Sequence, residues 1–322
     1  ISKAIHYFTQ AANQNISNAQ FYLGVIYYFG KYIKKDISKS INYLLVAADH
    51  NIPEAQFYLG LIYFENDDIL RDIKKSIYYF TQAANQNIAE AQFYLGTIYY
   101  ENSYVEQDIK KSIHYFTQAA NQSNINAQFN LGVIYFEGKY IKQDITKAID
   151  FFIMAANQNH AKAQFKLGTI FYEGQYIKQD INKAIHYFTL SADQNYSKAQ
   201  FYLGIIYYKG QVIKRNINKS IEYLTYAANN NHSKAQFNLG IIYYNGQYIV
   251  RDIQKAIHFF TLSANLNNAD AQYNLGIIYY NGQVITKDIN KSKYYFNLSA
   301  NQNNANAQFC LGIIYYKGHL IT

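Results

Sequence analysis

The sequence has almost none of the residues that build disulfide frameworks or cysteine-rich metal sites. Its 322 residues include one Cys, one Pro and one Met, and no Trp. One Cys permits no internal disulfide, which fits a reducing compartment. No apolar run approaches the ~20 residues that a membrane-spanning helix needs, and no secretory leader is visible. We therefore expect a cytoplasmic protein with no membrane insertion.

The chain is instead rich in apolar and aromatic residues, and these recur periodically. Half of it is hydrophobic, with 36 Tyr and 21 Phe, so it has enough apolar surface to exclude disorder. The stretch Ala-Gln-Phe-x-Leu-Gly-x-Ile-Tyr, first seen at residues 19–27, returns every 36 residues, nine times in all. Such a period is typical of a solenoid, in which each unit packs only on its neighbours. We expect one domain spanning 1–322, built from about nine helix-turn-helix repeats.

The first helix of each repeat is predicted over about Ser17 to Tyr28. Ala19, Leu23 and Ile26 fall on one face, as in an amphipathic helix. Gly24 lies beside that face, where glycine costs roughly 1 kcal/mol of helix propensity relative to Ala. A packing reason is expected: without a Cβ, Gly24 lets the second helix approach closely.

Glycine, asparagine and aspartate mark the helix ends. The first helix should end at a left-handed cap, namely Gly30, Gly138, Gly174, Gly210, Gly246, Gly282 and Gly318, or Asn66 and Asn102. The second helix should begin at an N-cap, namely Asp36, Asp72, Asp108, Asp144, Asp180, Asn216, Asp252 and Asp288. It should end near Asn15, Asn51, Asn87, Ser123, Asn159, Asn195, Asn231, Asn267 and Asn303. Pro53 falls in a first turn, where no backbone donor is needed.

These residues resemble the Sel-one-like repeat, a relative of the tetratricopeptide repeat. Its pattern is met in the fifth repeat by Ala163, Leu167, Gly168, Phe171, Gly174, Asp180, Lys183, Ala184, Tyr187, Ser191 and Ala192. The resemblance covers the whole chain. It implies an all-α solenoid, a right-handed superhelix that acts as a non-catalytic scaffold or adaptor for protein complexes. Such arrays are often one region of a larger protein, and we expect this chain to be an excerpt of a longer one.

Four positions of the first helix vary between repeats and lie on an arc away from Ala19, Leu23 and Ile26. By analogy with tetratricopeptide arrays, this arc lines the concave surface. It is acidic in the second and third repeats and basic in the fifth to seventh. The partner-binding candidates are Glu54, Tyr58, Glu90 and Tyr94 in the first half, and Lys162, Lys166, Lys198, Tyr202, Lys209, Lys234 and Asn238 in the second.

The whole-chain charge follows the same division. Residues 1–161 hold 13 Lys and Arg against 14 Asp and Glu, whereas residues 162–322 hold 16 against 7. One interpretation is that lysine keeps a long solenoid soluble. The other is a protein partner that is acidic toward the C-terminal half, docked within a larger cytoskeletal or signalling assembly. The sequence leaves open which face binds.

Two other functional classes remain open. A helical-repeat nucleic-acid-binding protein would need a basic track along the whole array, but acidic residues such as Glu54 and Glu90 interrupt it. The chain could also be the docking arm of a larger enzyme such as a kinase. The sequence itself contains no phosphate loop, metalloprotease motif or calcium loop. His6, His114, His186 and His258 recur too far apart to share a metal ion, and Cys310 has no fixed His neighbour. We expect no catalytic, cofactor or metal site.

Overall fold

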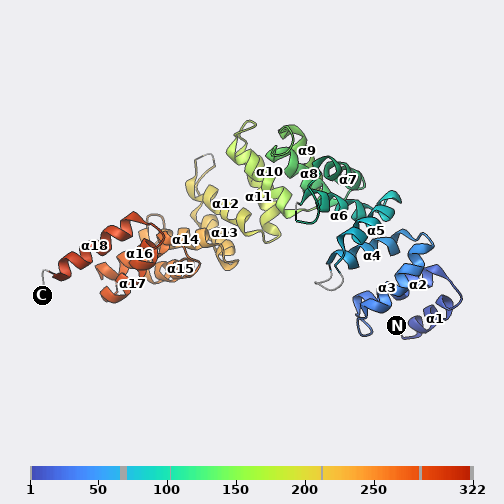
Figure 1. The fold of residues 1–322 in the computed structure, drawn as a ribbon. Coiled ribbons are helices and arrows are strands. Elements are labelled where there is room, and N and C mark those ends of the chain that lie inside the picture. Colours follow the sequence, from blue (N-terminus) through green and yellow to red (C-terminus); the bar gives the residue numbers. More distant parts are fainter. Residues whose placement is uncertain (1, 66–70, 102, 212, 283–284, 320–322) are drawn as a thin grey trace. The chain divides into compact units, whose positions relative to one another are not determined.

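The structure is a computed structural model that describes residues 2–65, 71–101, 103–211, 213–282 and 285–319. In these ranges the chain forms 18 α-helices joined by short loops and no strand (Figure 1). The predicted fold class, an all-α solenoid, is confirmed. The chain divides into two compact parts, Ile1–Gln158 and Asn159–Thr322, and each is described by itself. The prediction of a single domain over 1–322 stays a prediction.

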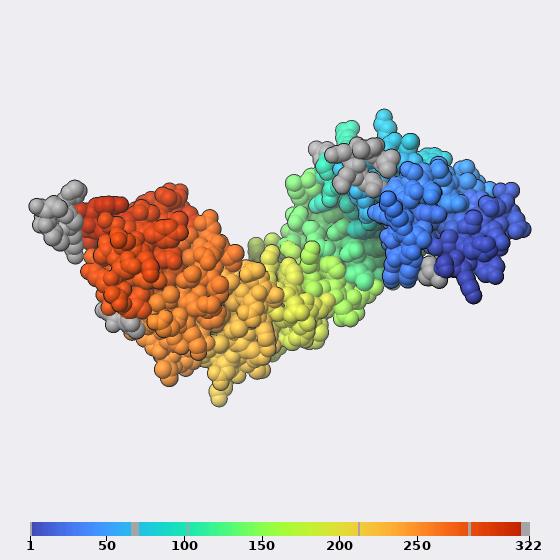
Figure 2. Space-filling model, turned by 90° about the horizontal axis from the view of Figure 1, so that it is seen from below, coloured from blue at the N-terminus to red at the C-terminus, as the bar shows by residue number. Residues whose placement is uncertain are grey.

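Each part is a row of helix pairs in chain order. Even-numbered helices are the first helices of the repeats and odd-numbered helices are the second. The first part contains α1 Ser2–Ala12, α2 Ser17–Phe29, α3 Ile37–Asp49, α4 Pro53–Glu65, α5 Ile73–Asn85, α6 Ala89–Tyr100, α7 Ile109–Asn121, α8 Ile125–Glu137 and α9 Ile145–Asn157. The second contains α10 Ala161–Glu173, α11 Ile181–Asp193, α12 Ser197–Lys209, α13 Ile217–Asn229, α14 Ser233–Asn245, α15 Ile253–Asn265, α16 Ala269–Asn281, α17 Ile289–Ala300 and α18 Ala305–His319. In the space-filling view, the colours of each part also follow chain order (Figure 2).

The helix ends lie at the predicted residues with few exceptions. Asn15 and its eight equivalents, including Ser123, all have φ between 56° and 65°, the left-handed region that asparagine tolerates. Gly30 has φ 63° and donates its N–H to the Ile26 carbonyl. The Asp36 side chain accepts a hydrogen bond from the Lys39 backbone N–H, as an N-cap residue should.

Two of the predicted ends of first helices lie at Asn66 and Asn102, outside the described residues. A third, at Gly318, is wrong, because α18 continues to His319. At Gly30 the turn is held by a hydrogen bond across the connection, which the Asp36 N–H donates to the Tyr27 carbonyl. Only four residues come after Gly318 in this sequence, so it contains no residue equivalent to Asp36.

The core of each repeat forms where its two helices cross at the recurring glycine. A Cβ built on Gly60 would lie 2.4 Å from the Phe80 ring, so only glycine allows the ring to pack there. Beside this contact, the Ser76 hydroxyl donates to the Gly60 carbonyl at 3.0 Å. Leu59 and Phe80 are fully buried. The prediction that glycine permits close approach of the second helix is confirmed.

A ladder of glutamines links the two helices of a repeat to each other and to the repeat before it. In the first part, the Gln122 amide donates to Gln92 Oε1 at 2.8 Å, and the Gln92 amide donates to the Ala84 carbonyl at 3.2 Å. The same glutamine contact joins Gln158 to Gln128. In the second part the ladder is interrupted, because Leu266 occupies the place of the donor. Gln236 Oε1 is buried there and has no hydrogen-bond partner.

Candidate protein-binding surface

The four variable positions are the second, sixth, ninth and thirteenth residues along the first helices. In the first part, Glu54 and Glu90 at the second position are exposed. Glu65 at the thirteenth position is exposed too. These carboxylates make the solvent-facing ends of α4 and α6 acidic.

Glu65 joins three successive first helices. Its Oε2 accepts a hydrogen bond from the Tyr28 hydroxyl of α2 at 3.2 Å, and its Oε1 accepts one from Tyr94 of α6 at 3.2 Å. Burial, and then the charge of Glu65, raise the pKa of each tyrosine to about 12. Both hydroxyls therefore stay protonated donors at neutral pH and hold the carboxylate in place.

The tyrosines of the arc do not point freely into solvent. Tyr58, Tyr94 and Tyr202 are all half-buried, and the Tyr94 ring stacks on Phe80 with centroids 5.1 Å apart. Leu61 at the ninth position is only 8% exposed. The prediction that this arc lies away from the packed face is wrong for these positions. The physical reason is that each first helix also packs against the second helix of the repeat before it.

The second part presents lysines at the equivalent positions. Lys162, Lys198 and Lys234 at the second position are exposed, as is Lys209 at the end of α12. Lys166 and Asn238 at the sixth position are half-buried, and the Asn238 amide donates to the Lys234 carbonyl at 2.7 Å. The Tyr202 ring stacks on Phe188 at 5.1 Å. Four of the seven candidates in this part therefore offer an exposed ammonium group.

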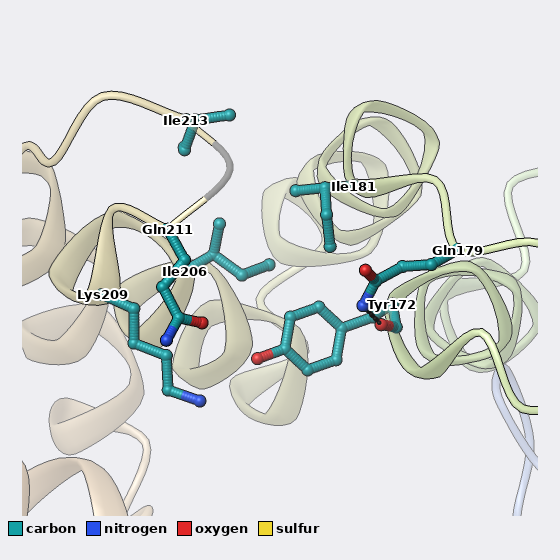
Figure 3. A pocket seen from close by; sticks show the side chains of 7 residues that line it. All are labelled: Tyr172, Gln179, Ile181, Ile206, Lys209, Gln211 and Ile213. Carbon is teal, nitrogen blue, oxygen red and sulfur yellow. Dashed lines mark hydrogen bonds between the residues drawn. The ribbon is translucent and has the colours of Figure 1, made fainter.

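A cavity of about 90 Å³ adjoins this basic surface between α10 and α12 (Figure 3). Its apolar lining comes from Tyr172, Ile181, Ile206 and Ile213, and its polar lining from Gln179, Gln211 and Lys209. The Gln179 side-chain amide donates a hydrogen bond to the Tyr172 backbone carbonyl at 2.6 Å. Figure 3 shows the Lys209 ammonium and the Tyr172 hydroxyl on the same side of the opening.

The second helices carry lysines of a different kind. Lys39 lies 3.7 Å from the Asp36 carboxylate and 5.3 Å from the centre of the Tyr27 ring. The same arrangement recurs in most repeats, for example at Lys183 with Asp180 and Phe171. These lysines are exposed but lie against a carboxylate and an aromatic face. Among the first-helix lysines, Lys162, Lys198, Lys209 and Lys234 are exposed, whereas Lys166 is half-buried.

The comparisons with known proteins match the repeat unit throughout. The model described as Sel1 repeat matches residues 1–16, 17–52, 53–88, 89–124, 125–160, 161–196, 197–232, 233–268 and 269–304. The chain belongs to the Sel1 repeat family. Sel1 repeat proteins are helical-repeat scaffolds that mediate protein–protein interactions. No curated protein matches the chain.

Two solved Sel1-like structures resemble the chain over nearly its whole length. One is a protective antigen present in uropathogenic Escherichia coli strains and displaying an SLR fold. It is 27% identical in sequence to this chain, with a TM-score of 0.90, and the match spans 97% of this chain and 67% of the antigen chain. The other is a Sel1 repeat protein from Oxalobacter formigenes, which is 26% identical in sequence with a TM-score of 0.77. The match spans 96% of this chain and 90% of the Oxalobacter chain.

The Sel1 repeat fold is typically a non-catalytic scaffold. In the described ranges, no group of three His, Cys, Asp or Glu side chains could hold a metal ion. His6, His114, His186 and His258 are exposed. Cys310 is half-buried in α18, and burial raises the pKa of its thiol. No helix of the described chain is both long and apolar enough to span a membrane.

Two histidines have a structural role that the sequence analysis missed. Nδ1 of His160 accepts a hydrogen bond from the Ala163 N–H at 3.1 Å, and Nδ1 of His232 accepts one from Ala235 at 3.2 Å. Asn124 and Asn268 cap their first helices in the same way. Burial, with the charge of a nearby lysine, lowers the pKa of both histidines. The signal in the sequence was that His and Asn share the position before the first helix in five repeats, at Asn124, His160, His232, Asn268 and Asn304.

Proposed function

We propose that the chain is a scaffold that binds a protein partner along the first helices of its second part, and that the bound segment of this partner is acidic. The observation that carries the proposal is the contrast between the two sets of lysines. Lys162, Lys198 and Lys234 are exposed at one helix position in three successive repeats. The second-helix lysines at the same spacing are also exposed, but all three lie over aromatic rings and two of the three pair with carboxylates.

The spacing of these lysines favours an extended acidic segment. Each lysine belongs to one repeat, so a bound peptide would meet a positive charge once per repeat. Such electrostatic complementarity increases association rates and selects against basic partners. The carboxylates of the first part oppose a continuous track for nucleic-acid phosphates, so a protein partner is favoured.

The test is binding of a fluorescent polyglutamate peptide to the full chain, measured by anisotropy. Reversing Lys162, Lys198 and Lys234 together to Glu should weaken binding by about tenfold or more, since each reversal replaces an attraction with a repulsion. The matched control reverses Lys183, Lys219 and Lys255 on the second helices of the same three repeats, which changes the net charge equally.

The two triple variants separate the alternatives. We expect the control to retain most of the binding, and both variants to keep the helical circular dichroism of the parent. Equal losses in the two variants would contradict a first-helix site and leave only a general effect of net charge.

A further inference from the structure

The sixth residue of the first helix is a tyrosine in four of the nine repeats, at Tyr22, Tyr58, Tyr94 and Tyr202. In α6 the Tyr94 ring stacks on Phe80 with an interplanar angle of 13°, and Phe64 meets it edge-on at 5.6 Å. Its hydroxyl donates to Glu65. The tyrosine ring therefore stacks on one aromatic ring and meets a second edge-on, and its hydroxyl has a carboxylate acceptor.

In the fourth repeat the tyrosine is absent while its surroundings are retained. Asn130 of α8 occupies the place of Tyr94. Phe116, Tyr100 and Glu101 occupy the places of Phe80, Phe64 and Glu65. Asn130, Phe116, Tyr100 and Glu101 all line one cavity of about 140 Å³.

The size and charge of this cavity indicate its occupant. An apolar cavity of about 150 Å³ is large enough to bind benzene, so a phenol ring is of the right size. Glu101 lines the cavity and is exposed, so its carboxylate can accept a hydrogen bond from a hydroxyl, as that of Glu65 does. Among the described residues that line the cavity, Glu101 is the one that carries a charge.

We propose that this cavity is a socket for a tyrosine side chain of a partner protein, flanked in the partner by basic residues. The tyrosine takes the place that Tyr94 fills in the preceding repeat, with its ring over Phe116 and its hydroxyl donating to Glu101. Nearby lysine or arginine residues of the partner are attracted by Glu101. The proposal rests on the proposed function only in taking the ligand to be a protein.

The combination of a stacking phenylalanine, Phe116, and an acceptor carboxylate, Glu101, distinguishes Asn130 from the sixth-position asparagines of the second part. Asn238 follows a repeat that ends its first helix with Lys209 and offers Leu224 in place of the phenylalanine. For Asn274, the residue equivalent to Phe116 is Phe260, but the residue equivalent to Glu101 is Asn245. Neither Asn238 nor Asn274 therefore has both a phenylalanine and a carboxylate at the equivalent positions.

The first measurement uses p-cresol as the probe, with 4-methylanisole as its methylated counterpart that cannot donate a hydrogen bond. Binding to the full chain is followed by ligand-observed NMR. We expect p-cresol to bind and 4-methylanisole to bind at least several-fold more weakly. Asn130→Tyr should reduce p-cresol binding at least tenfold, because the new ring fills the socket. Asn274→Tyr is the matched control and should leave it unchanged.

The second measurement uses the blocked tripeptide Lys-Tyr-Lys. It should bind more tightly than p-cresol, and Glu101→Gln should weaken it at least threefold by removing the charge. Absence of p-cresol binding, or equal binding to Asn130→Tyr, would overturn the socket. Binding of p-cresol without the tripeptide would overturn the partner assignment. Both results are independent of the polyglutamate test, which concerns lysines of the second part.

Discussion

The ends of α4 and α12 occupy the same place in the repeat and carry opposite charges. Glu65 ends α4 and accepts hydrogen bonds from two tyrosines. Lys209 ends α12 and lines a cavity beside Tyr172. Leu59 and Leu203, six residues earlier in each helix, are fully buried. The thirteenth residue can differ in charge between the two parts because its side chain ends in solvent. The leucine cannot be replaced without disturbing the packing of the core.

The glutamine ladder gives a second comparison. Within the first part, Gln86, Gln122 and Gln158 each donate to the glutamine in the first helix of the same repeat. In the second part Leu266 interrupts the series and leaves an acceptor of Gln236 without a partner. The difference shows that one substitution at the end of the second helix affects a buried group in the first helix of the same repeat.

The largest expected effect comes from the crossing glycines. Gly60→Ala in the first part would place a Cβ 2.4 Å from the Phe80 ring, and such overpacking costs about 1–3 kcal/mol. Gly312→Ala in α18 of the second part meets no atom within 4 Å and should gain up to about 1 kcal/mol of helix propensity. Urea unfolding of the two variants measures both. A gain in stability for Gly60→Ala would mean that close approach is not why this position is glycine.

The ladder can be broken in one part and repaired in the other. Gln122→Leu should leave Gln92 Oε1 without its donor and cost about 1–3 kcal/mol, the penalty for an unsatisfied buried group. Leu266→Gln should restore the missing donor to Gln236 and stabilise the chain by about 1 kcal/mol. The helix ends at Gln194 and Gln122 already accommodate glutamine. The measurement is again the urea midpoint, and an unchanged midpoint for Leu266→Gln would argue that the orphaned acceptor costs nothing.

The smallest expected effect is a pH dependence specific to the second part. Burial, and then Lys234 and Lys198, lower the pKa of His232 below the ordinary value of about 6.5. As pH falls below that value the unfolded chain takes up the proton first, so stability is intact above about pH 6.5 and decreases toward the folded-state pKa. His232→Asn supplies the cap that Asn124 provides in the first part and should flatten this decrease. Thermal melts between about pH 5 and 8 compare the two proteins, and identical slopes would exclude His232 as a source.

The candidate surface was only partly predictable from the sequence. The exposed lysines, including Lys162 and Lys198, lie where helical periodicity places them. The tyrosines were misplaced because periodicity describes one helix, and Tyr94 owes its burial to Phe80 of the preceding second helix. The histidine caps were missed because a histidine reads as a surface residue until its Nδ1 is seen to accept a backbone N–H.

The sequence by itself determined the register of the repeat, the helix ends and the residues at their crossings. These depend on local conformational preferences, such as the left-handed backbone at Asn15 or the N-cap at Asp36. Only the tertiary structure decided that Gln92 is part of a ladder, that Gln236 has an acceptor without a partner and that Asn130 opens a cavity. Each of these depends on residues that are distant in sequence and come together only when helices pack, within one repeat for the glutamines and between neighbouring repeats for Asn130.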